Sequence, residues 1–131
     1  MKILLITHGN LGQEMLAIAQ EMLEKDLSAR VTAIGLPLQG SHTDFAKEVH
    51  LAIESVDPMD RVVVMTDVFG GTPSNLVLPY QQAGRLEMIT GLNLGMLMHL
   101  LTLDLSGSLE DISREIKRAG QEAILVAGDF L

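Results

Sequence analysis

The chain has 131 residues, which is the usual size of one domain and long enough to bury a hydrophobic core without cross-links. Its formal net charge of −8 argues against nucleic acid or an anionic membrane as a partner, because both require basic patches. The absence of cysteine excludes disulfides and thiolate metal sites and fits a cytoplasmic location.

Hydrophobic residues make up 47% of the chain but aromatic residues only 3%, so the core must consist of aliphatic side chains and methionine. This apolar excess predicts that part of the surface meets a second copy of the chain. No apolar stretch reaches the about 18 residues that span a bilayer, so no membrane insertion is expected.

The first half of the chain alternates between strand and helix patterns. Residues 2–7, KILLIT, form the continuous apolar run typical of a parallel strand that is covered on both faces. The helix predicted after the turn at 9–12 has its apolar residues on one face, which is expected to point inward. These residues are Leu11, Met15, Ile18, Ala19, Met22 and Leu23. A second strand is predicted over 30–36, and a second helix begins with a capping pattern at Ser41 and Asp44.

The second half of the chain continues the alternation. Residues 61–67, RVVVMTD, predict a third strand, and the helix that follows must kink or end early at Pro79. A helix that is apolar nearly all round is predicted over 93–101. Ser108 and Gly120 are expected to begin and close the last helix. The remaining predicted strands are 85–90, RLEMIT, and 123–128, AILVAG.

This alternation predicts the fold class of residues 1–131: a single-domain, open α/β structure with a mainly parallel β-sheet and helices on both faces. In such sheets ligands bind outside the carboxyl ends of the strands, where the strand order reverses. If the strand order is 2-1-3-4, the first and third strands are neighbours. His8 and Asp67, at the ends of these two strands, are then expected to face each other.

The predicted pair of His8 and Asp67 has a specific chemical use. A carboxylate that accepts the Nδ1 hydrogen of an imidazole fixes the tautomer of the ring and leaves the Nε2 lone pair free. His8 is therefore the candidate nucleophile, and Asp67 is the residue that orients it.

The turn that follows Asp67 contains two adjacent glycines. Gly70 and Gly71 can adopt backbone conformations closed to other residues and can present their amide hydrogens to an anion. Thr72 is then the expected N-cap and Pro73 the first helical residue, so that the positive end of the helix faces the same crevice. A histidine beside an anion site points to phosphoryl transfer, in which fixed backbone donors stabilise the equatorial oxygens.

Three segments carry a family resemblance: THG at 7–9, DVFGGTPSN at 67–75 and TGLNLGML at 90–97. In this order they resemble the enzyme IIA component of the mannose family of the bacterial phosphoenolpyruvate-dependent sugar phosphotransferase system. The resemblance implies that His8 is phosphorylated by the phosphohistidine of the phosphocarrier protein HPr. It also implies that His8 passes the group to a histidine of enzyme IIB.

The same resemblance implies roles for the surrounding residues. Asp67 would orient His8, and Gly70, Gly71 and Thr72 would help to hold the phosphoryl group. A homodimer is also implied, in which the C-terminal strand, AILVAG, is exchanged with the sheet of the partner. No cofactor and no metal ion are expected.

Two positions differ from the family pattern. Gly95 stands where a proline commonly begins the helix, which is expected to loosen the start of that helix. Pro79 inside the third helix is also unusual. His42, His50 and His99 are interpreted as structural. His42 and His50 share a helix face, but two imidazoles without a third ligand make a poor metal site.

Two other α/β classes fit the sequence less well. A response-regulator receiver needs acidic residues after its first strand to bind magnesium, where this chain has Thr7, His8 and Gly9. A flavodoxin-like cofactor binder stacks its ring on aromatic residues, and Phe69 is the only well-placed one. Within the family, two alternatives stay open: a stand-alone regulator that responds to its phosphorylation state, and the phosphotransfer subunit of a dihydroxyacetone kinase.

Overall fold

The structure, a computed structural model, describes all residues from 1 to 131 and contains one open four-stranded sheet. Every neighbouring pair of strands is parallel, and the strand order is β2-β1-β3-β4. The strands are β1 (Lys2–His8), β2 (Val31–Leu36), β3 (Val62–Thr66) and β4 (Leu86–Thr90). The fold class and the strand order expected from the sequence are therefore confirmed.

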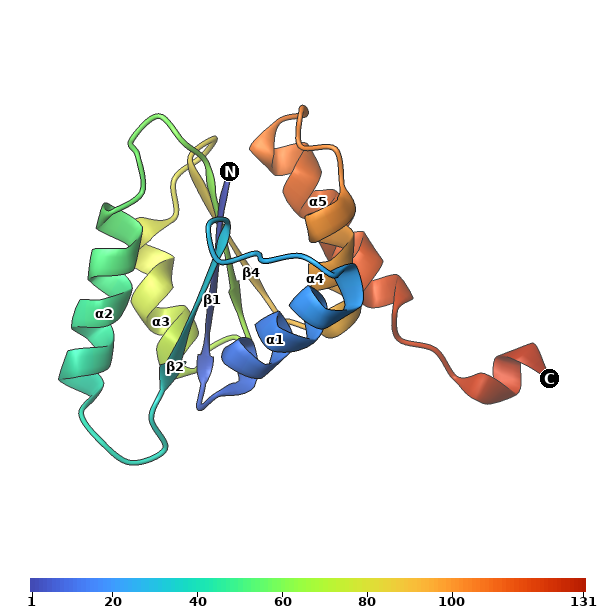
Figure 1. Cartoon of the computed structure of the whole chain (residues 1–131), viewed down its shortest axis with the longest axis horizontal. Coiled ribbons are helices and arrows are strands. Elements are labelled where there is room, and N and C mark those ends of the chain that lie inside the picture. The colour runs from blue at the N-terminus through green and yellow to red at the C-terminus, as the bar shows by residue number, and fades with distance from the viewer.

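Helices cover both faces of this sheet (Figure 1). The α-helices are α1 (Leu11–Leu23), α2 (His42–Glu54), α3 (Thr72–Val77), α4 (Leu94–Thr102) and α5 (Leu109–Glu122), and two 3₁₀ turns are η1 (Leu78–Tyr80) and η2 (Ala127–Phe130). Helices α1, α4 and α5 lie on one face, and α2 and α3 lie on the other. None of the helices is both long and apolar enough to cross a membrane.

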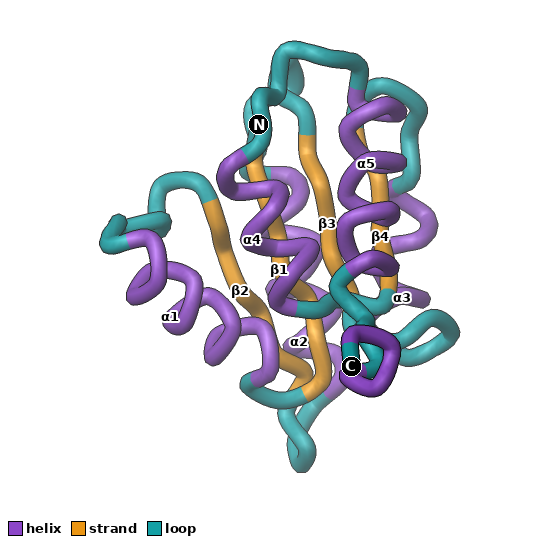
Figure 2. The backbone as a smooth tube through the Cα atoms, turned by 90° about the vertical axis from the view of Figure 1, so that its right-hand side faces the viewer, coloured by secondary structure: helices purple, strands orange, loops and turns teal.

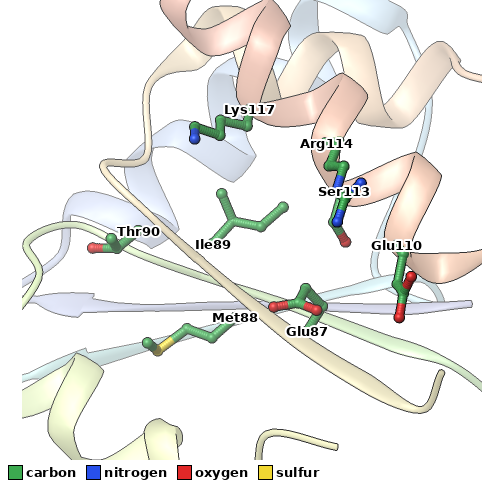
Figure 3. Close-up of a pocket in the computed structure, with 8 residues that line it drawn as sticks. All are labelled: Glu87, Met88, Ile89, Thr90, Glu110, Ser113, Arg114 and Lys117. Atoms are coloured by element: carbon green, nitrogen blue, oxygen red, sulfur yellow. The ribbon is translucent and has the colours of Figure 1, made fainter. Parts of the chain in front are cut away.

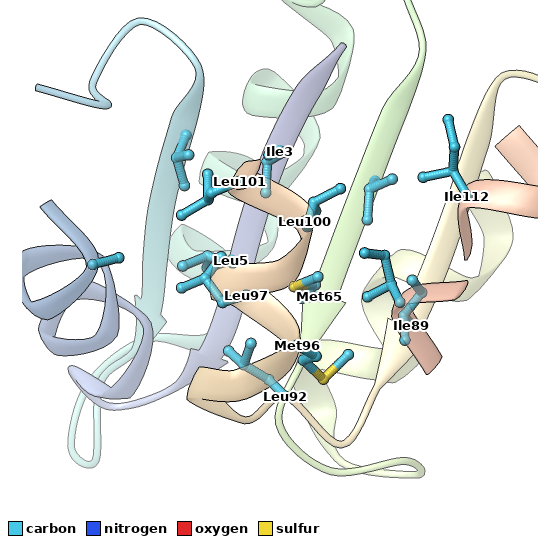
Figure 4. Close-up of a cluster of buried hydrophobic side chains, with 14 of the residues drawn as sticks. Ile3, Leu5, Met65, Ile89, Leu92, Met96, Leu97, Leu100, Leu101 and Ile112 are labelled. Carbon is cyan, nitrogen blue, oxygen red and sulfur yellow. The ribbon is translucent and has the colours of Figure 1, made fainter. Parts of the chain in front are cut away.

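The sheet divides the hydrophobic core into two clusters, because successive residues of a strand point to opposite faces. Ile3 and Leu5 of β1 belong to the same cluster as Leu97 of α4 (Figure 4). Leu4, between them in sequence, belongs to the cluster on the other face, together with Phe45 of α2. Burial on both faces explains why β1 and β3 are continuous apolar runs rather than alternating ones.

Side-chain caps fix the starts of two helices where the sequence predicted them. Ser41 Oγ accepts a hydrogen bond from the amide of Asp44 at 3.2 Å, and Ser108 Oγ accepts one from the amide of Asp111 at 3.1 Å. The helix that contains Pro79 ends early, as expected. Helix α3 stops after six residues, and Pro79 lies in the 3₁₀ turn η1.

Helix α1 is rotated relative to the predicted orientation. Ala19 is buried as predicted, but three of the other apolar residues are exposed. These three, called the α1 ridge below, are Leu11, Ile18 and Met22. Gly12 faces the sheet instead: its amide donates to Thr7 Oγ1 at 3.0 Å, and a Cβ at Gly12 would lie 3.2 Å from Leu5 Cβ. This close approach sets the rotation of the helix and turns the ridge toward solvent.

The chain near its C-terminus differs from the prediction in two ways. Helix α5 continues through Gly120 to Glu122, because the missing side chain of Gly120 serves close packing against Met96 of α4 rather than helix termination. Residues 123–128 form no strand of this sheet, and the segment projects away from the body of the protein (Figure 1). A strand needs a neighbouring strand for its hydrogen bonds, and this segment has none within the chain.

Gly95 has a packing role in the first turn of α4. A Cβ at this position would lie 2.6 Å from Ala123 Cβ, so glycine allows α4 to approach the end of α5. The expected loosening of this helix start is countered by Asn93, whose Oδ1 accepts a hydrogen bond from the amide of Met96 at 2.9 Å.

The turn that follows β1 at residues 9–10, the His8 turn, lies directly against β2. The amide of Gly9 donates to the carbonyl of Leu36 at 2.7 Å, and the Gly9 carbonyl oxygen lies 1.9 Å from where a Cβ of Gly35 would stand. Only a residue without a side chain fits at position 35. Gly35 therefore fixes how closely the His8 turn can approach β2.

Gly35→Ala is expected to destabilise the protein by about 1–3 kcal/mol, because its methyl group must displace the backbone of the His8 turn. Gly107→Ala is the matched control, since a Cβ at Gly107 meets no atom within 4 Å. Urea unfolding of both variants measures the effect. Equal stabilities for the two variants would show that the turn adapts without cost.

Candidate functional site

The parallel ladder between β1 and β3 brings His8 and Asp67 together. Ile6 pairs with Thr66 in this ladder, so that both strands end at the same edge of the sheet. One carboxylate oxygen of Asp67, Oδ2, accepts hydrogen bonds from the His8 amide at 3.0 Å and from the His8 Nδ1 at 2.8 Å. The facing pair expected from the strand order is therefore present.

These contacts define the tautomer of the His8 ring. An ionised carboxylate can only accept, so Nδ1 must carry the hydrogen and Nε2 keeps its lone pair. The side chain of His8 is 42% exposed, whereas that of Asp67 is only 9% exposed. The carboxylate is thus largely shielded, whereas the ring that it binds is accessible from solvent.

The electrostatics of Asp67 favour its ionised form. Burial alone acts to raise the pKa of this carboxyl, but the hydrogen bonds from the His8 amide and ring outweigh it and hold the pKa below its ordinary value. The other carboxylate oxygen, Oδ1, accepts from the amide of Val68 at 3.1 Å. Asp67 is therefore a fixed negative charge against the Nδ1 side of His8.

The two glycines of the following turn are required for different reasons. Gly70 has a φ of +83°, a left-handed conformation that favours glycine, as expected. Gly71 has an ordinary φ of −76°, so conformational freedom does not explain it. A Cβ at Gly71 would lie 2.9 Å from His8 Cε1 and 3.5 Å from Nε2, so glycine is needed for close approach to the ring.

The start of α3 lies one residue earlier than predicted. Gly71 is the N-cap, and its carbonyl accepts the amide of Asn75 at 2.9 Å, so that Thr72 and Pro73 are the first two helical residues. The correction arises because the extended backbone of Gly71 already begins the helix and no side chain is needed as a cap. The amide hydrogens of Gly70 and Thr72 have no acceptor within the chain.

A pair of buried hydroxyls lies beneath this turn. Ser74 Oγ donates to the carbonyl of Val68 at 2.8 Å and lies 2.6 Å from Thr66 Oγ1. Ser74 is not among the site residues predicted from the sequence. Its burial among apolar groups depends on the packing of α3 against β3, so no local sequence signal distinguishes it from an exposed serine.

The largest groove of the protein, about 460 Å³, lies along β4 and α5 rather than at His8 (Figure 3). Thr90 and Ser113, which face it from the strand and the helix, have buried hydroxyl oxygens without a hydrogen-bond partner. His8 and Asp67 line none of the cavities. The exposed histidine is thus accessible from a surface rather than at the bottom of a pocket.

The other histidines lie outside this arrangement. His50 Nδ1 is 2.5 Å from the hydroxyl of Tyr80, and His99 Nε2 is 3.2 Å from a carboxylate oxygen of Glu115. His42 is the exposed first residue of α2. All three lie on helices, and none is hydrogen-bonded to His8 or Asp67.

The fold and the site define an open α/β domain that presents an oriented histidine at the carboxyl ends of its strands. A family model for the fructose IIA component of the phosphotransferase system (PTS), named EIIA-man, matches residues 2–117. The chain therefore belongs to the mannose-type enzyme IIA family of the PTS.

Individual relatives agree with this assignment. The fructose-specific EIIA component of the PTS from Bacillus subtilis is 28% identical over 86 residues, which cover 65% of this chain and 59% of that relative. The chain thus spans about three fifths of the relative that it matches.

Two solved structures share the fold. The PTS component EIIA from Streptococcus agalactiae superposes with a TM-score of 0.83, covers 98% of each chain and is 22% identical. The mannose/sorbose-specific IIA subunit from Enterococcus faecalis superposes with a TM-score of 0.79, covers 95% of this chain and 92% of its own, and is 22% identical.

Asp67→Asn tests the electrostatic support of the site. Because the pKa of Asp67 is lower in the folded than in the unfolded chain, the ionised carboxylate stabilises the fold above about pH 4, and this contribution is lost as pH falls through the folded-state value. The difference in unfolding free energy between wild type and Asp67→Asn should therefore be larger at pH 5 than at pH 3.

Urea unfolding of dilute protein at the two pH values measures this difference. Glu48→Gln, on the exposed face of α2, controls for the removal of one negative charge. If the difference in unfolding free energy between wild type and Asp67→Asn is as large at pH 3 as at pH 5, the ionised Asp67 carboxylate is not what stabilises the fold.

Proposed function

We propose that the chain is a histidine phosphocarrier of the sugar phosphotransferase system. His8 accepts a phosphoryl group from phospho-HPr in the cytoplasm and passes it to a histidine of enzyme IIB, for uptake and phosphorylation of a sugar. The observation that carries this proposal is the 2.8 Å contact between His8 Nδ1 and the Asp67 carboxylate, which leaves Nε2 free in an exposed ring.

The proposed transfer step balances without any further reactant. The Nε2 lone pair of neutral His8 attacks phosphorus in line, and the bond from phosphorus to the donor imidazole breaks and leaves its electron pair on the donor nitrogen. The His8 ring then carries hydrogen on Nδ1 and phosphoryl on Nε2, and is positively charged. Asp67 stabilises this charge, which supports its role as the orienting residue.

Gly70, Gly71 and Thr72 are proposed as the site that holds the phosphoryl oxygens. The backbone of Gly71 passes close to the Nε2 side of the ring, and the amides of Gly70 and Thr72 have no other acceptor. Backbone donors at these positions would stabilise the equatorial oxygens in transfer without a basic side chain.

The surroundings of His8 suit a protein partner. Leu38, whose side chain lies against Gly9, is 89% exposed, and Val68 and Phe69, in the turn after Asp67, are 57% and 69% exposed. Together with Leu11 of the α1 ridge, these exposed side chains belong to the segments that follow β1, β2 and β3, and they are proposed to form an apolar rim around the His8 ring, which lines no pocket. Such a rim can exclude water while two histidines from different proteins approach each other.

A homodimer formed by exchange of the C-terminal segment is also proposed. Strand β4 is at one edge of the sheet (Figure 2), and the groove beside it contains the unpartnered hydroxyls of Thr90 and Ser113. The C-terminal segment projects away from the body of the protein, and its residues Ile124, Leu125 and Val126 are 65–75% exposed. Pairing of this segment with β4 of a second copy would provide hydrogen-bond partners for the unpaired backbone groups of β4 and would cover these side chains.

Phosphorylation of the purified protein by phosphoenolpyruvate, enzyme I and HPr tests the carrier role. Wild type should acquire acid-labile, base-stable phosphate, and His8→Ala should acquire none. His50→Ala, which removes an exposed histidine from α2, should be labelled like the wild type.

The fate of the label separates the alternatives. Transfer of the label to an enzyme IIB supports a transport component, and transfer to a dihydroxyacetone kinase would favour the phosphotransfer subunit of that kinase. Stable label that neither accepts would favour the stand-alone regulator. Absence of label on the wild type, with a known enzyme IIA labelled in parallel, would overturn the carrier role with HPr as donor.

Val126→Asp tests the proposed dimer. Wild type should scatter light as a particle of twice the 14.2 kDa chain mass, and a charge at Val126 should convert it to the monomer because the segment would be buried against a second copy. Leu51→Asp on α2 is the matched control, since Leu51 is 66% and Val126 is 65% exposed. A monomeric wild type at micromolar concentration would exclude the exchange.

A further inference from the structure

We propose that Ser74 is a positioning residue for His8: its buried hydroxyl holds the 67–71 loop so that Asp67 meets Nδ1 of the imidazole and Gly71 lies beside its Cε1. The predicted effect of Ser74 on the transfer rate rests on the function proposed above. Its predicted effect on the orientation of the His8 ring can be measured on the unphosphorylated protein.

The loop touches the His8 ring at both of its ends. Asp67, at the first end, binds Nδ1 at 2.8 Å. Gly71, at the other end, lies so close to the ring that a Cβ there would be 2.9 Å from Cε1 and would push the ring aside. A movement of the loop would therefore change both the orientation of the ring and the space beside Nε2.

The middle of this loop is not held in place by buried side chains. Val68 and Phe69 are largely exposed, and Gly70 has no side chain. The Val68 carbonyl is instead fixed from inside by Ser74 Oγ at 2.8 Å, with a longer contact to the Gly71 amide at 3.4 Å. On the outer side, the exposed side-chain amide of Asn75 donates to the Gly70 carbonyl at 3.1 Å.

The direction of the inner hydrogen bonds follows from counting hydrogens. A serine hydroxyl has one hydrogen, and Ser74 donates it to the Val68 carbonyl. Thr66 Oγ1, 2.6 Å away, must then be the donor to Ser74 Oγ. Thr66 is completely buried and Ser74 is 1% exposed, so the hydrogen bond between them is shielded from water and ties the loop, through Val68, to the end of β3.

Ser74→Ala removes the link to the loop and leaves the Thr66 hydroxyl buried without its acceptor. The rate of phosphoryl transfer to His8 is expected to fall by about ten- to a hundredfold, since small misplacements of reacting groups have effects of this size. Nitrogen-15 NMR should show a smaller fraction of the His8 tautomer with hydrogen on Nδ1. Ser55→Ala, which removes a hydroxyl that donates to the carbonyl of Ala52 at the end of α2, should match the wild type in both measurements.

The double variant Thr66→Val, Ser74→Ala distinguishes positioning from stability. It removes the unpartnered Thr66 hydroxyl, so its unfolding midpoint should lie above that of Ser74→Ala. The transfer rate should nevertheless stay low, because the Val68 carbonyl remains unanchored. Ser74→Thr, which restores a hydroxyl, should recover most of the rate.

Two results would overturn the inference. One is a Ser74→Ala variant with the wild-type transfer rate and wild-type His8 NMR signals. The other is a double variant whose transfer rate recovers together with its stability, which would make Ser74 a structural residue only. If the wild type accepts no phosphoryl group, the proposed function fails, and the tautomer of His8 in these variants still decides whether Ser74 positions the ring.

Discussion

A single carboxylate oxygen joins two residues at the ends of neighbouring strands, His8 and Asp67, which are 59 residues apart in the sequence. Asp67 Oδ2 accepts both the main-chain amide and the ring nitrogen of His8, so the ring is oriented relative to the backbone that carries it. This geometry exists only in the observed register of β1 and β3. A slip of one residue would turn the side chains of a strand to the opposite face and separate the pair.

Much of the space around His8 is made by residues that have no side chain. Gly35 allows the turn after His8 to lie against β2, and Gly71 allows the start of α3 to approach the ring. Neither role requires an unusual backbone conformation at these two positions. The site is thus defined by close backbone contacts as much as by its polar groups, which explains how an exposed ring can have a fixed environment.

The sequence predicted the features that depend on local pattern and topology. The parallel strands, the caps at Ser41 and Ser108, and the facing His8 and Asp67 all follow from periodicity and strand order. Features that depend on contacts between distant elements were not predictable. The rotation of α1 is set by Gly12 against β1, and the tie from Ser74 to the 67–71 loop needs α3 packed on β3. Residues 123–128 have a strand pattern but no neighbouring strand within the chain.

The outward rotation of α1 also affects the behaviour of the protein in solution. The α1 ridge adds Leu11, Ile18 and Met22 to a surface on which the segment after α5 is already apolar. Mutual repulsion at a net charge of −8 keeps such surfaces of different molecules apart at neutral pH. At the isoelectric point near pH 4.8 this repulsion vanishes, and colloidal solubility should reach its minimum there.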